Sequence, residues 1–359
     1  MRVCVTGAKG FIGGHVVDFL RREGHEVVPV DKEESSSLAE RITGCDAIIH
    51  LAAVNRGKDL EEANLAIAQQ LLQALESSGA RPHLIVSSST YRDVTEGYGS
   101  EYGIAKRAVD EILQAWCRRK GMGCTIAVIP NVYGVGCRPF YNSAIATFCH
   151  QLAHGEQPRL IEDRELEFIN VEHVARKLTG LLNHQGGIVR LHGDATMRVS
   201  GILATLQRFM EMRKRGVVPD MTDPFERDLY VTLDSYVKER VTTPEVHADP
   251  RGELCELVRL ERGGQVFFST TKPGVVRGNH FHTRKLEKFC VVKGEAIIRL
   301  RKVDESEVQE LRVRAPAIVD IPAFRTHNIE NVGTEELLTV FWSSEILDPQ
   351  DTDSPRREV

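Results

Sequence analysis

The chain reads Arg277-Gly-Asn-His280-Phe-His282-Thr-Arg-Lys-Leu-Glu287 near its C-terminal end. If the segment around His280 is extended, the two histidines are two residues apart and point to the same face of a strand. A carboxylate follows them at Glu287, and a further histidine, His327, begins a later strand-like stretch. Because neutral imidazole and carboxylate groups bind Zn, Fe, Mn or Ni, these four side chains are predicted to form a metal site.

The length and composition predict a globular protein of two domains. The 359 residues correspond to roughly two domains. Contents of 42% hydrophobic and 27% charged residues are typical of soluble proteins. Lys plus Arg number 46 and Asp plus Glu number 51, so the net charge of −5 argues against a nucleic-acid partner or a polybasic contact with a membrane. The apolar runs are strand-sized and well short of the roughly 20 residues of a membrane span.

The N-terminus and the cysteines predict a cytoplasmic protein. The chain enters a strand-like run at Arg2, which leaves no room for a signal peptide. The eight cysteines are scattered and contain no CxxC pair. Cys4, Cys45 and Cys290 lie inside apolar runs, so we expect them to be small core residues in a reducing compartment.

Short β-branched runs alternate with longer stretches of helical periodicity over residues 1–130. The predicted strands are Arg2–Thr6, Glu26–Val30, Ala47–Leu51, His83–Ser87 and Cys124–Ile129. The predicted helices are Phe11–Glu23, Lys58–Ser77 and Glu101–Arg119. Such alternation predicts a Rossmann-type, doubly wound parallel sheet.

The pattern changes at about Val246. From there, short alternating strands follow one another with Gly, Pro and Asp turns and without helical periodicity. This pattern favours an all-β barrel. The sequence therefore predicts an α/β domain over residues 1–242 and an all-β domain over residues 243–359.

The first strand is joined to the first helix by Gly7-Ala-Lys-Gly10-Phe11-Ile12-Gly13. Gly7 allows a tight turn, Gly10 lets the backbone approach a pyrophosphate, and Gly13 lets the helix pack on the sheet. The start of the helix, at Phe11 and Ile12, then offers free N–H groups to phosphates. In this strand–turn–helix context the glycines predict a dinucleotide-binding site.

Further residues are predicted to line the dinucleotide site. Asp31 closes the second strand, where an acidic residue hydrogen-bonds the adenosine ribose and favours NAD over NADP. Lys32 beside it is suited to a 2′-phosphate, so the choice between NADH and NADPH stays open. Near the adenine we expect the third strand to contribute Asp46, Leu51, Ala52 and Ala53.

Tyr102-Gly-Ile-Ala-Lys106 lies at the start of a predicted helix, and its i, i+4 spacing puts the phenol and the ammonium on one face. A phenol with a pKa of about 10 is a poor proton donor at neutral pH, and a neighbouring cation favours its phenolate. Ser87, Ser88 and Ser89 end the fourth strand, where hydroxyls reach a substrate carbonyl. Together with the glycine turn, these residues indicate a hydride-transfer site.

Residues 1–240 resemble the extended short-chain dehydrogenase/reductase family in the glycine turn, the serine run and the Tyr-x-x-x-Lys pair. The resemblance implies that Tyr102 is the catalytic acid and Lys106 its electrostatic partner. It implies that Ser89 donates to the carbonyl, with Ser88 as the fallback. It also implies NADPH, with NADH as the alternative, and a nucleotide-activated sugar as substrate. The 4,6-dehydratases of the family have Asp-Glu after the catalytic Ser or Thr, whereas Thr90-Tyr91 follows here, so dehydration is disfavoured.

The C-terminal part resembles the cupin β-barrel in its motifs G…HxHxxxxE…G and P…H…N. Over nearly the whole chain, the domain order and the stretches 142–149, 278–282 and 327–331 are similar to the CapF-type capsular polysaccharide synthesis enzymes. This resemblance implies C3 epimerisation of UDP-2-acetamido-2,6-dideoxy-4-keto-hexose by the cupin. NAD(P)H-dependent reduction of the C4 ketone then gives UDP-2-acetamido-2,6-dideoxy-L-talose for N-acetyl-L-fucosamine of capsule or O-antigen. It also implies a divalent metal, Zn²⁺ as first choice, a UDP-activated 4-keto-6-deoxy amino sugar as partner, and a homodimer.

Two alternatives stay open for the C-terminal domain. The stretches Asp249–Gly252 and Arg277–His280 also resemble the metal-free 3,5-epimerases, in which the matching histidine is the general base. His282 and Glu287 depart from that family and favour a metal, in which case Lys288 is one candidate for the base. The second alternative is a single-activity NAD(P)-dependent sugar reductase whose cupin only binds or dimerises.

Overall fold

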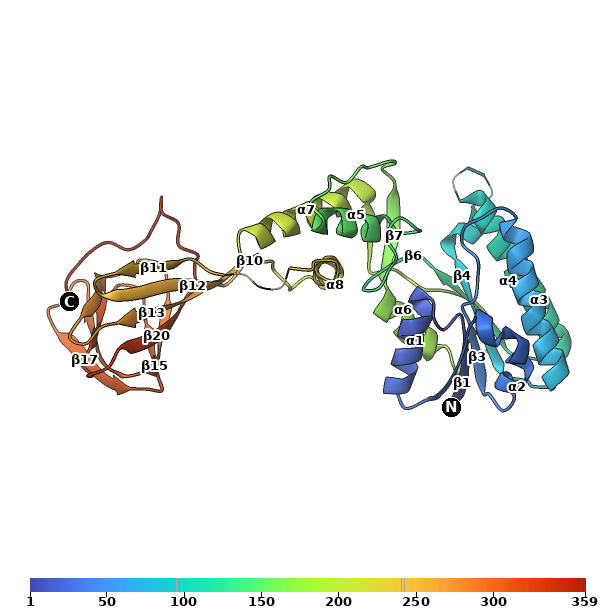
Figure 1. The fold of residues 1–359 in the computed structure, drawn as a ribbon, viewed down its shortest axis with the longest axis horizontal. Coiled ribbons are helices and arrows are strands. Elements are labelled where there is room, and N and C mark those ends of the chain that lie inside the picture. Colours follow the sequence, from blue (N-terminus) through green and yellow to red (C-terminus); the bar gives the residue numbers. More distant parts are fainter. Residues whose placement is uncertain (95, 98, 240, 242) are drawn as a thin grey trace. The chain divides into compact units, whose positions relative to one another are not determined.

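A six-stranded sheet forms the centre of the first of two structural units (Figure 1). The computed structural model describes every residue of the chain except 95, 98, 240 and 242. The strands lie in the order β2-β1-β3-β4-β5-β8, and all neighbouring pairs are parallel. They are β1 (Arg2–Thr6), β2 (Glu26–Val30), β3 (Ala47–His50), β4 (His83–Ser89), β5 (Cys124–Ile129) and β8 (Gly187–Arg190).

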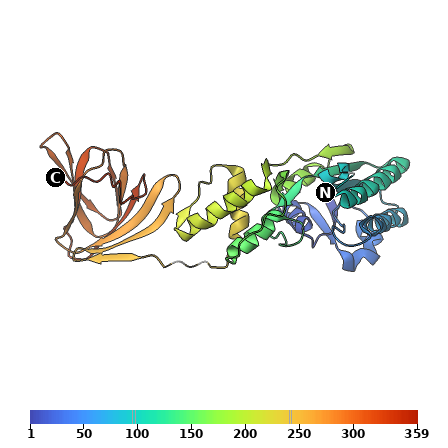
Figure 2. The same cartoon turned by 90° about the horizontal axis from the view of Figure 1, so that it is seen from above.

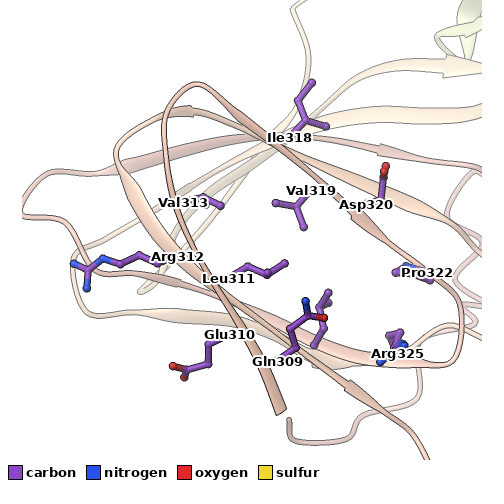
Figure 3. A pocket seen from close by; sticks show the side chains of 11 residues that line it. Gln309, Glu310, Leu311, Arg312, Val313, Ile318, Val319, Asp320, Pro322 and Arg325 are labelled. Atoms are coloured by element: carbon purple, nitrogen blue, oxygen red, sulfur yellow. The ribbon is translucent and has the colours of Figure 1, made fainter. Parts of the chain in front are cut away.

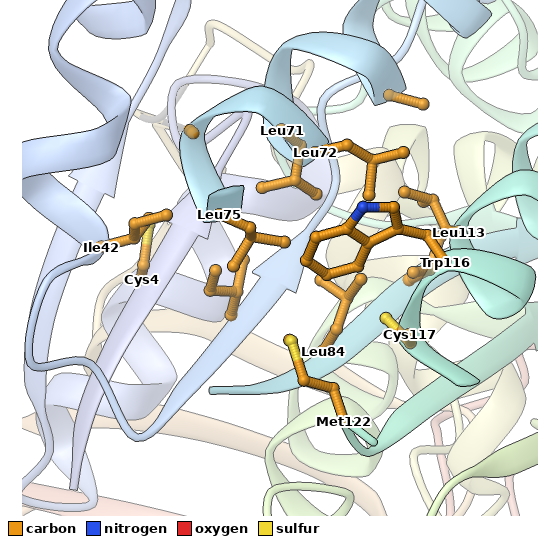
Figure 4. Close-up of a cluster of buried hydrophobic side chains, with 14 of the residues drawn as sticks. Cys4, Ile42, Leu71, Leu72, Leu75, Leu84, Leu113, Trp116, Cys117 and Met122 are labelled. Carbon is orange, nitrogen blue, oxygen red and sulfur yellow. The ribbon is translucent and has the colours of Figure 1, made fainter. Parts of the chain in front are cut away.

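Helices cover both faces of this sheet, which makes it doubly wound (Figure 1). On one face, α3 and α4 bury a cluster that includes Leu71, Leu75, Leu113 and Trp116 (Figure 4). Full burial of a leucine such as Leu75 contributes roughly 1.5–3 kcal/mol. On the other face, α1 and α6 pack against the sheet. The main helices are α1 (Phe11–Arg22), α2 (Leu38–Ile42), α3 (Leu60–Ser78), α4 (Ser100–Lys120) and α6 (Val171–Gly180), with the 3-10 turns η1 (Lys32–Ser37) and η2 (Thr90–Asp93).

The sheet order reverses at β1, which lies between β2 and β3. At such a point the connections leave in opposite directions, and a crevice opens beyond the carboxyl ends of the strands. The residues that follow β1, β3 and β4 therefore meet at one edge of the sheet.

A small sheet and three further helices complete the helical part of the chain. In the sheet, β6 pairs with β7 in parallel and β7 with β9 in antiparallel orientation. These elements are β6 (Asn131–Tyr133), β7 (Glu165–Asn170), β9 (Ala195–Arg198), α5 (Ala144–Ala153), α7 (Val199–Lys214) and α8 (Pro224–Asp234).

The second unit consists mainly of two sheets that share a hydrophobic core, as Figure 1 and Figure 2 show from two directions. Every strand pair in it is antiparallel except β10 with β12. The larger sheet has β10 (Val217–Val218), β11 (Val246–Asp249), β12 (Gly252–Leu260), β13 (Gly264–Thr271), β15 (Glu287–Lys293), β18 (Ala317–Ile321) and β20 (Leu337–Ser343). The smaller sheet has β14 (Val276–His280), β16 (Glu295–Lys302), β17 (Val308–Arg314) and β19 (Arg325–Asn331). The predicted Rossmann-type sheet followed by an all-β domain is confirmed.

The two units do not divide the chain at a single point. Met1–Gln207 and Pro224–Lys238 form the first unit, and Arg208–Asp223 and Glu239–Val359 form the second. The predicted boundary at 242/243 falls on residue 242, which is outside the described residues. Sequence patterns miss the segment 208–223, because the two-residue strand β10 is too short to have a periodicity. None of the helices in the described part of the chain combines the length and hydropathy of a membrane span.

Candidate functional site

The glycine turn after β1 has the geometry that the sequence predicts. Gly7 has a left-handed φ of +69°, and a Cβ on it would lie 2.8 Å from the backbone nitrogen of Ala52. A Cβ on Gly13 would lie 2.0 Å from the carbonyl oxygen of Gly7. Only glycine fits at either position, and the close packing aims the N-terminus of α1 at the crevice. A hollow of about 290 Å³ is open there, lined by Lys9, Gly10, Phe11, Gly14, His15, Asp18 and Gly136.

Asp31 lies beside the glycine turn. Its carboxylate accepts hydrogen bonds from the backbone N–H of Lys9 (2.7 Å) and of Lys32 (2.8 Å). Leu51 follows β3 and donates its N–H to the carbonyl of Thr6 (3.1 Å). The predicted dinucleotide-site residues that follow β1, β2 and β3 therefore lie at the carboxyl edge of the sheet. Ile12 belongs to α1, and Ala52 and Ala53 follow Leu51 in the loop after β3.

Asp46 does not lie at this edge, and its prediction as an adenine contact is wrong. It precedes β3, and its carboxylate accepts a hydrogen bond from the backbone N–H of Arg2 (2.7 Å), where β1 begins. Because β1 and β3 are parallel, Asp46 lies at the opposite end of the strands from Gly7. Its role is to close the amino edge of the sheet.

Tyr102 and Ser89 meet at the carboxyl edge of β4. Burial raises the pKa of Tyr102 to about 12, and the neighbouring Ser89 side chain, which lowers this pKa, does not offset the effect. The ammonium of Lys106 lies 5.8 Å from the centre of the Tyr102 ring and donates to the carbonyl of Ser87 (3.1 Å). Burial lowers the pKa of Lys106 to about 8. A phenol, a hydroxyl and a buried cation therefore converge on one point.

Ser88 points elsewhere. Its hydroxyl donates to Oδ2 of Asp110 (2.6 Å), a fully buried carboxylate that also pairs with Arg92 (3.2 Å). Burial raises the pKa of Asp110 to about 6. This arrangement leaves Ser89, rather than Ser88, beside Tyr102. Sequence reasoning missed Asp110, although its i+4 spacing from Lys106 places it on the same helical face.

In the second unit, His280, His282, Glu287 and His327 form one cluster. Each offers a ligand atom, and these atoms all lie within 4.8 Å of one another. His280 and His327 are cross-strand partners on β14 and β19, with ring centres 4.5 Å apart. Glu287 begins β15, and its Oε2 lies 3.2 Å from Nε2 of His282 and 3.4 Å from Nε2 of His327. The four residues predicted as metal ligands are therefore brought together.

The local geometry that brings His280 and His282 together is not the predicted extended strand. Asn279 has a left-handed φ of +61°, and the register between β14 and β19 shifts between Gly278 and His280. The side chain of Asn328 donates to Oδ1 of Asn279 (2.9 Å) and supports this conformation. β14 ends at His280, so His282 lies in the following loop. A bulge, and not strand alternation, aims both rings into the cluster.

The hydrogen bonds of the cluster set its tautomers. Nδ1 of His282 donates to the carbonyl of Asp353 (2.5 Å), and Nδ1 of His327 donates to the carbonyl of Arg325 (3.0 Å). In the neutral form of each ring the lone pair is therefore on Nε2, and neither Nε2 has a hydrogen-bond partner among the described residues. Burial lowers the pKa of His282, but the contact with Glu287 outweighs it and raises that pKa, so a metal at this site would take the place of a proton on Nε2. Burial opposes ionisation of Glu287, but His282 and His327 lower the pKa of its carboxyl to about 2. A divalent metal is typically bound by histidines of this kind, whose Nδ1–H groups are hydrogen-bonded to backbone carbonyls while their Nε2 atoms face one point.

His280 is neutral at pH 7. Burial, with a contribution from His327, lowers the pKa of His280 to about 4. A neutral imidazole serves equally as a metal ligand or as an acceptor of a proton.

Lys288 is excluded as the base of this site. It follows Glu287 on β15 and therefore points to the opposite face of the sheet. Its ammonium pairs with the carboxylate of Asp320, and the side chain is half exposed.

A larger hollow, of about 600 Å³, lies between β17 and β18 and contains none of the four cluster residues (Figure 3). It is open, and it is lined by a mixture of apolar and charged side chains. The candidate site of this unit is therefore the cluster of His280, His282, Glu287 and His327, which lies outside this hollow.

Comparisons with known proteins match both parts of the chain. Residues 3–190 match the NAD dependent epimerase/dehydratase family, and residues 247–355 match the polysaccharide biosynthesis C-terminal domain. The UDP-2-acetamido-2,6-beta-L-arabino-hexul-4-ose reductase of Pseudomonas aeruginosa is 34% identical over 371 residues, covering 99% of this chain and 98% of the relative.

Solved structures of capsular polysaccharide assembling protein CapF are similar over the whole length. CapF from Staphylococcus aureus has a TM-score of 0.88 and 30% identity, with 100% of both chains covered. A CapF structure with the inhibitor 3-isopropenyl-tropolone has a TM-score of 0.84 and 28% identity, again with 100% of both chains covered.

Proposed function

The chain belongs to the NAD dependent epimerase/dehydratase family and is of the CapF type, and on this premise we propose that it is a bifunctional nucleotide-sugar enzyme. Its substrate is UDP-2-acetamido-2,6-dideoxy-4-keto-hexose. The all-β unit epimerises C3, and the Rossmann-type unit reduces the C4 ketone to give UDP-2-acetamido-2,6-dideoxy-L-talose. The observation that carries the proposal is the convergence of Tyr102, Ser89 and Lys106 at the dinucleotide edge.

The reduction uses the side chains at the end of β4 and the start of α4. A reduced nicotinamide dinucleotide, with its pyrophosphate held at the glycine turn, would supply the hydride. Ser89 donates a hydrogen bond to the C4 oxygen and holds it beside the phenol. Tyr102 gives its proton to that oxygen as negative charge develops there, and the ammonium of Lys106 stabilises the phenolate left behind.

The order of the two reactions follows from the acidity of the sugar. A proton on C3 is acidic only while C4 is a ketone, because the adjacent carbonyl delocalises the negative charge. Epimerisation therefore precedes reduction, and reduction fixes the new configuration.

The cluster of three histidines and Glu287 fits a divalent metal, with Zn²⁺ as our first choice. The support comes from the unpartnered, buried Nε2 atoms of His282 and His327, which converge on an ionised carboxylate. A metal in this site supplies positive charge that stabilises negative charge beside C3. The protein itself orients the ligands, excludes water through burial and holds His282 and His327 in one tautomer.

The proposal is tested in D₂O with purified protein and the UDP-4-keto sugar. Without nicotinamide, we expect one deuterium to enter C3, as detected by mass spectrometry and NMR. With NADPH or NADH, we expect stoichiometric oxidation of the coenzyme and an alcohol at C4. Reduction without any exchange would assign the all-β unit to binding or dimerisation, and absence of both would overturn the proposal.

The reduction is expected to depend on the charge of Lys106. Below about pH 8 the buried amine is protonated, and above it the charge is lost. Because kcat/KM reports groups of the free enzyme, it should fall by about tenfold per pH unit above pH 8. A profile of kcat/KM that stays flat to pH 10 would show that this charge does not assist Tyr102.

A further inference from the structure

The C-terminal segment 351–357 returns to the end of β14, which carries His280, and to the loop after it, which carries His282. The backbone N–H of Phe281 donates to the carbonyl of Pro355 (3.3 Å), and that of Arg357 donates to the carbonyl of Asn279 (2.9 Å). Between them, His280 and Arg356 form an antiparallel bridge. The C-terminal segment 351–357 (the tail) thus pairs in an antiparallel, strand-like manner with the residues around His280.

Asp353 binds the same loop through its carboxylate. Oδ1 accepts from the backbone N–H (2.9 Å) and the hydroxyl (2.6 Å) of Thr283. Oδ2 accepts from the backbone N–H groups of Arg284 and Lys285, both at 3.1 Å. One carboxylate therefore satisfies three successive backbone donors of a turn that lies outside any strand.

The neighbours of Asp353 add two further anchors. The buried ammonium of Lys285 donates to the carbonyl of Thr352 (2.6 Å). Arg284 pairs with the carboxylate of Asp351 (2.7 Å), which is exposed and contributes little. The tail therefore holds the loop 283–285 through the backbone N–H groups of the loop and through the side chains of Arg284 and Lys285.

The carbonyl of Asp353 accepts the Nδ1–H of His282 at 2.5 Å. This contact determines which nitrogen of His282 carries the proton, and it directs the Nε2 lone pair towards Glu287. His327 obtains the same effect locally from Arg325, two residues away, whereas His282 depends on a residue 71 positions later in the chain.

We propose that the C-terminal segment 351–357 is a positioning element of the metal centre, and that Asp353 is its principal residue. The segment touches no reacting atom. It sets the tautomer of His282 and holds the loop between His280 and Glu287 in the shape that brings the ligand atoms together. This inference rests on the metal centre of the proposed function.

The test measures Zn²⁺ and Co²⁺ affinity by competition with a chromogenic chelator. A chain that ends at Gln350 should bind each metal about 10- to 100-fold more weakly than the full chain, the usual effect of removing the partner of a ligating histidine. Its Co²⁺ absorption spectrum should also change, because the coordination geometry is no longer fixed. A chain that ends at Arg357 is the matched control and should behave as the full chain does.

Asp353→Asn provides a second test that leaves the chain length unchanged. Both carboxylate oxygens accept hydrogen bonds, so an amide nitrogen in either place faces a donor, and we expect weaker metal binding and an altered Co²⁺ spectrum. Asp348→Asn is the control, because the carboxylate of Asp348 accepts only from the nearby Gln350 among the described residues. Near-UV circular dichroism and melting curves separate these effects from a loss of fold.

Two outcomes distinguish failure of the metal centre from failure of the positioning role. A full chain that binds no metal overturns the metal centre and this inference together. A full chain that binds metal, with Asp353→Asn equal to it in affinity and spectrum, overturns the positioning role alone.

Discussion

Replacing Tyr102 by Phe is expected to abolish ketone reduction and to leave deuterium exchange at C3 unchanged. The structure places this phenol beside Ser89 and the buried ammonium of Lys106. Loss of a positioned general acid lowers a rate by about 10²- to 10⁴-fold. The ring is retained, so its contact with Lys106 and the packing of α4 persist. The measurements are coenzyme oxidation and mass-detected exchange on the same preparation.

Tyr133→Phe is the matched control for this variant. Tyr133 is fully buried, and its hydroxyl has no hydrogen-bond partner among the described residues. Its removal should leave reduction within about twofold of the wild-type rate, as expected for the loss of a buried hydroxyl that makes no hydrogen bond to the described residues. Undiminished reduction by Tyr102→Phe would exclude Tyr102 as the acid. Loss of exchange together with reduction would contradict the assignment of the two reactions to separate sites.

The parts of the fold that sequence patterns predict are those dictated by local chemistry. Gly7 and Gly13 are recognisable because no side chain fits against Ala52 or the Gly7 carbonyl. The predicted bounds of β1 and β5 match the structure because buried parallel strands are continuous apolar runs, rich in β-branched residues, between turns. Those of β2 also match, although β2 is a partly exposed strand at the edge of the sheet. The i, i+4 pair of Tyr102 and Lys106 needs only a helix to place both on one face.

Other features depend on contacts between distant segments and are not visible in a local pattern. The bulge at Asn279 arises where β14 pairs with β19, and its register is set by residues about 50 positions away. The bond from His282 to Asp353 spans 71 positions. Asp46 was misplaced for a related reason, because an acid before a buried strand has the same local pattern at either edge of a sheet. The residue types and their spacing predicted the four candidate metal ligands. The pairing of β14 with β19 and the contact with the C-terminal segment determine how these side chains come together.

Removal of the metal is expected to abolish exchange at C3. A metal contributes several kcal/mol of charge stabilisation, and each factor of ten in rate corresponds to about 1.36 kcal/mol, so the exchange rate should fall by more than about 100-fold. The chelated protein should also melt at a lower temperature, since a ligand that binds only the folded state stabilises it. Glu287→Gln should reproduce both effects, because it removes the one negative charge of the cluster while keeping its volume. The measurements are metal content, melting temperature and deuterium incorporation before and after chelation.

Asp320→Asn is the control for Glu287→Gln, since Asp320 lies opposite Lys288 on the neighbouring strand and points away from the cluster. Its exchange rate and metal content should equal those of the wild type. Comparing the effect of chelation with that of His280→Ala distinguishes a metal ligand from a general base at His280. If chelation leaves exchange intact and His280→Ala removes it, the neutral imidazole of His280 takes the C3 proton directly and the metal reading is wrong. If chelation abolishes exchange and added Zn²⁺ restores it, the four side chains act as ligands, and the base must be sought among other residues that face the cluster.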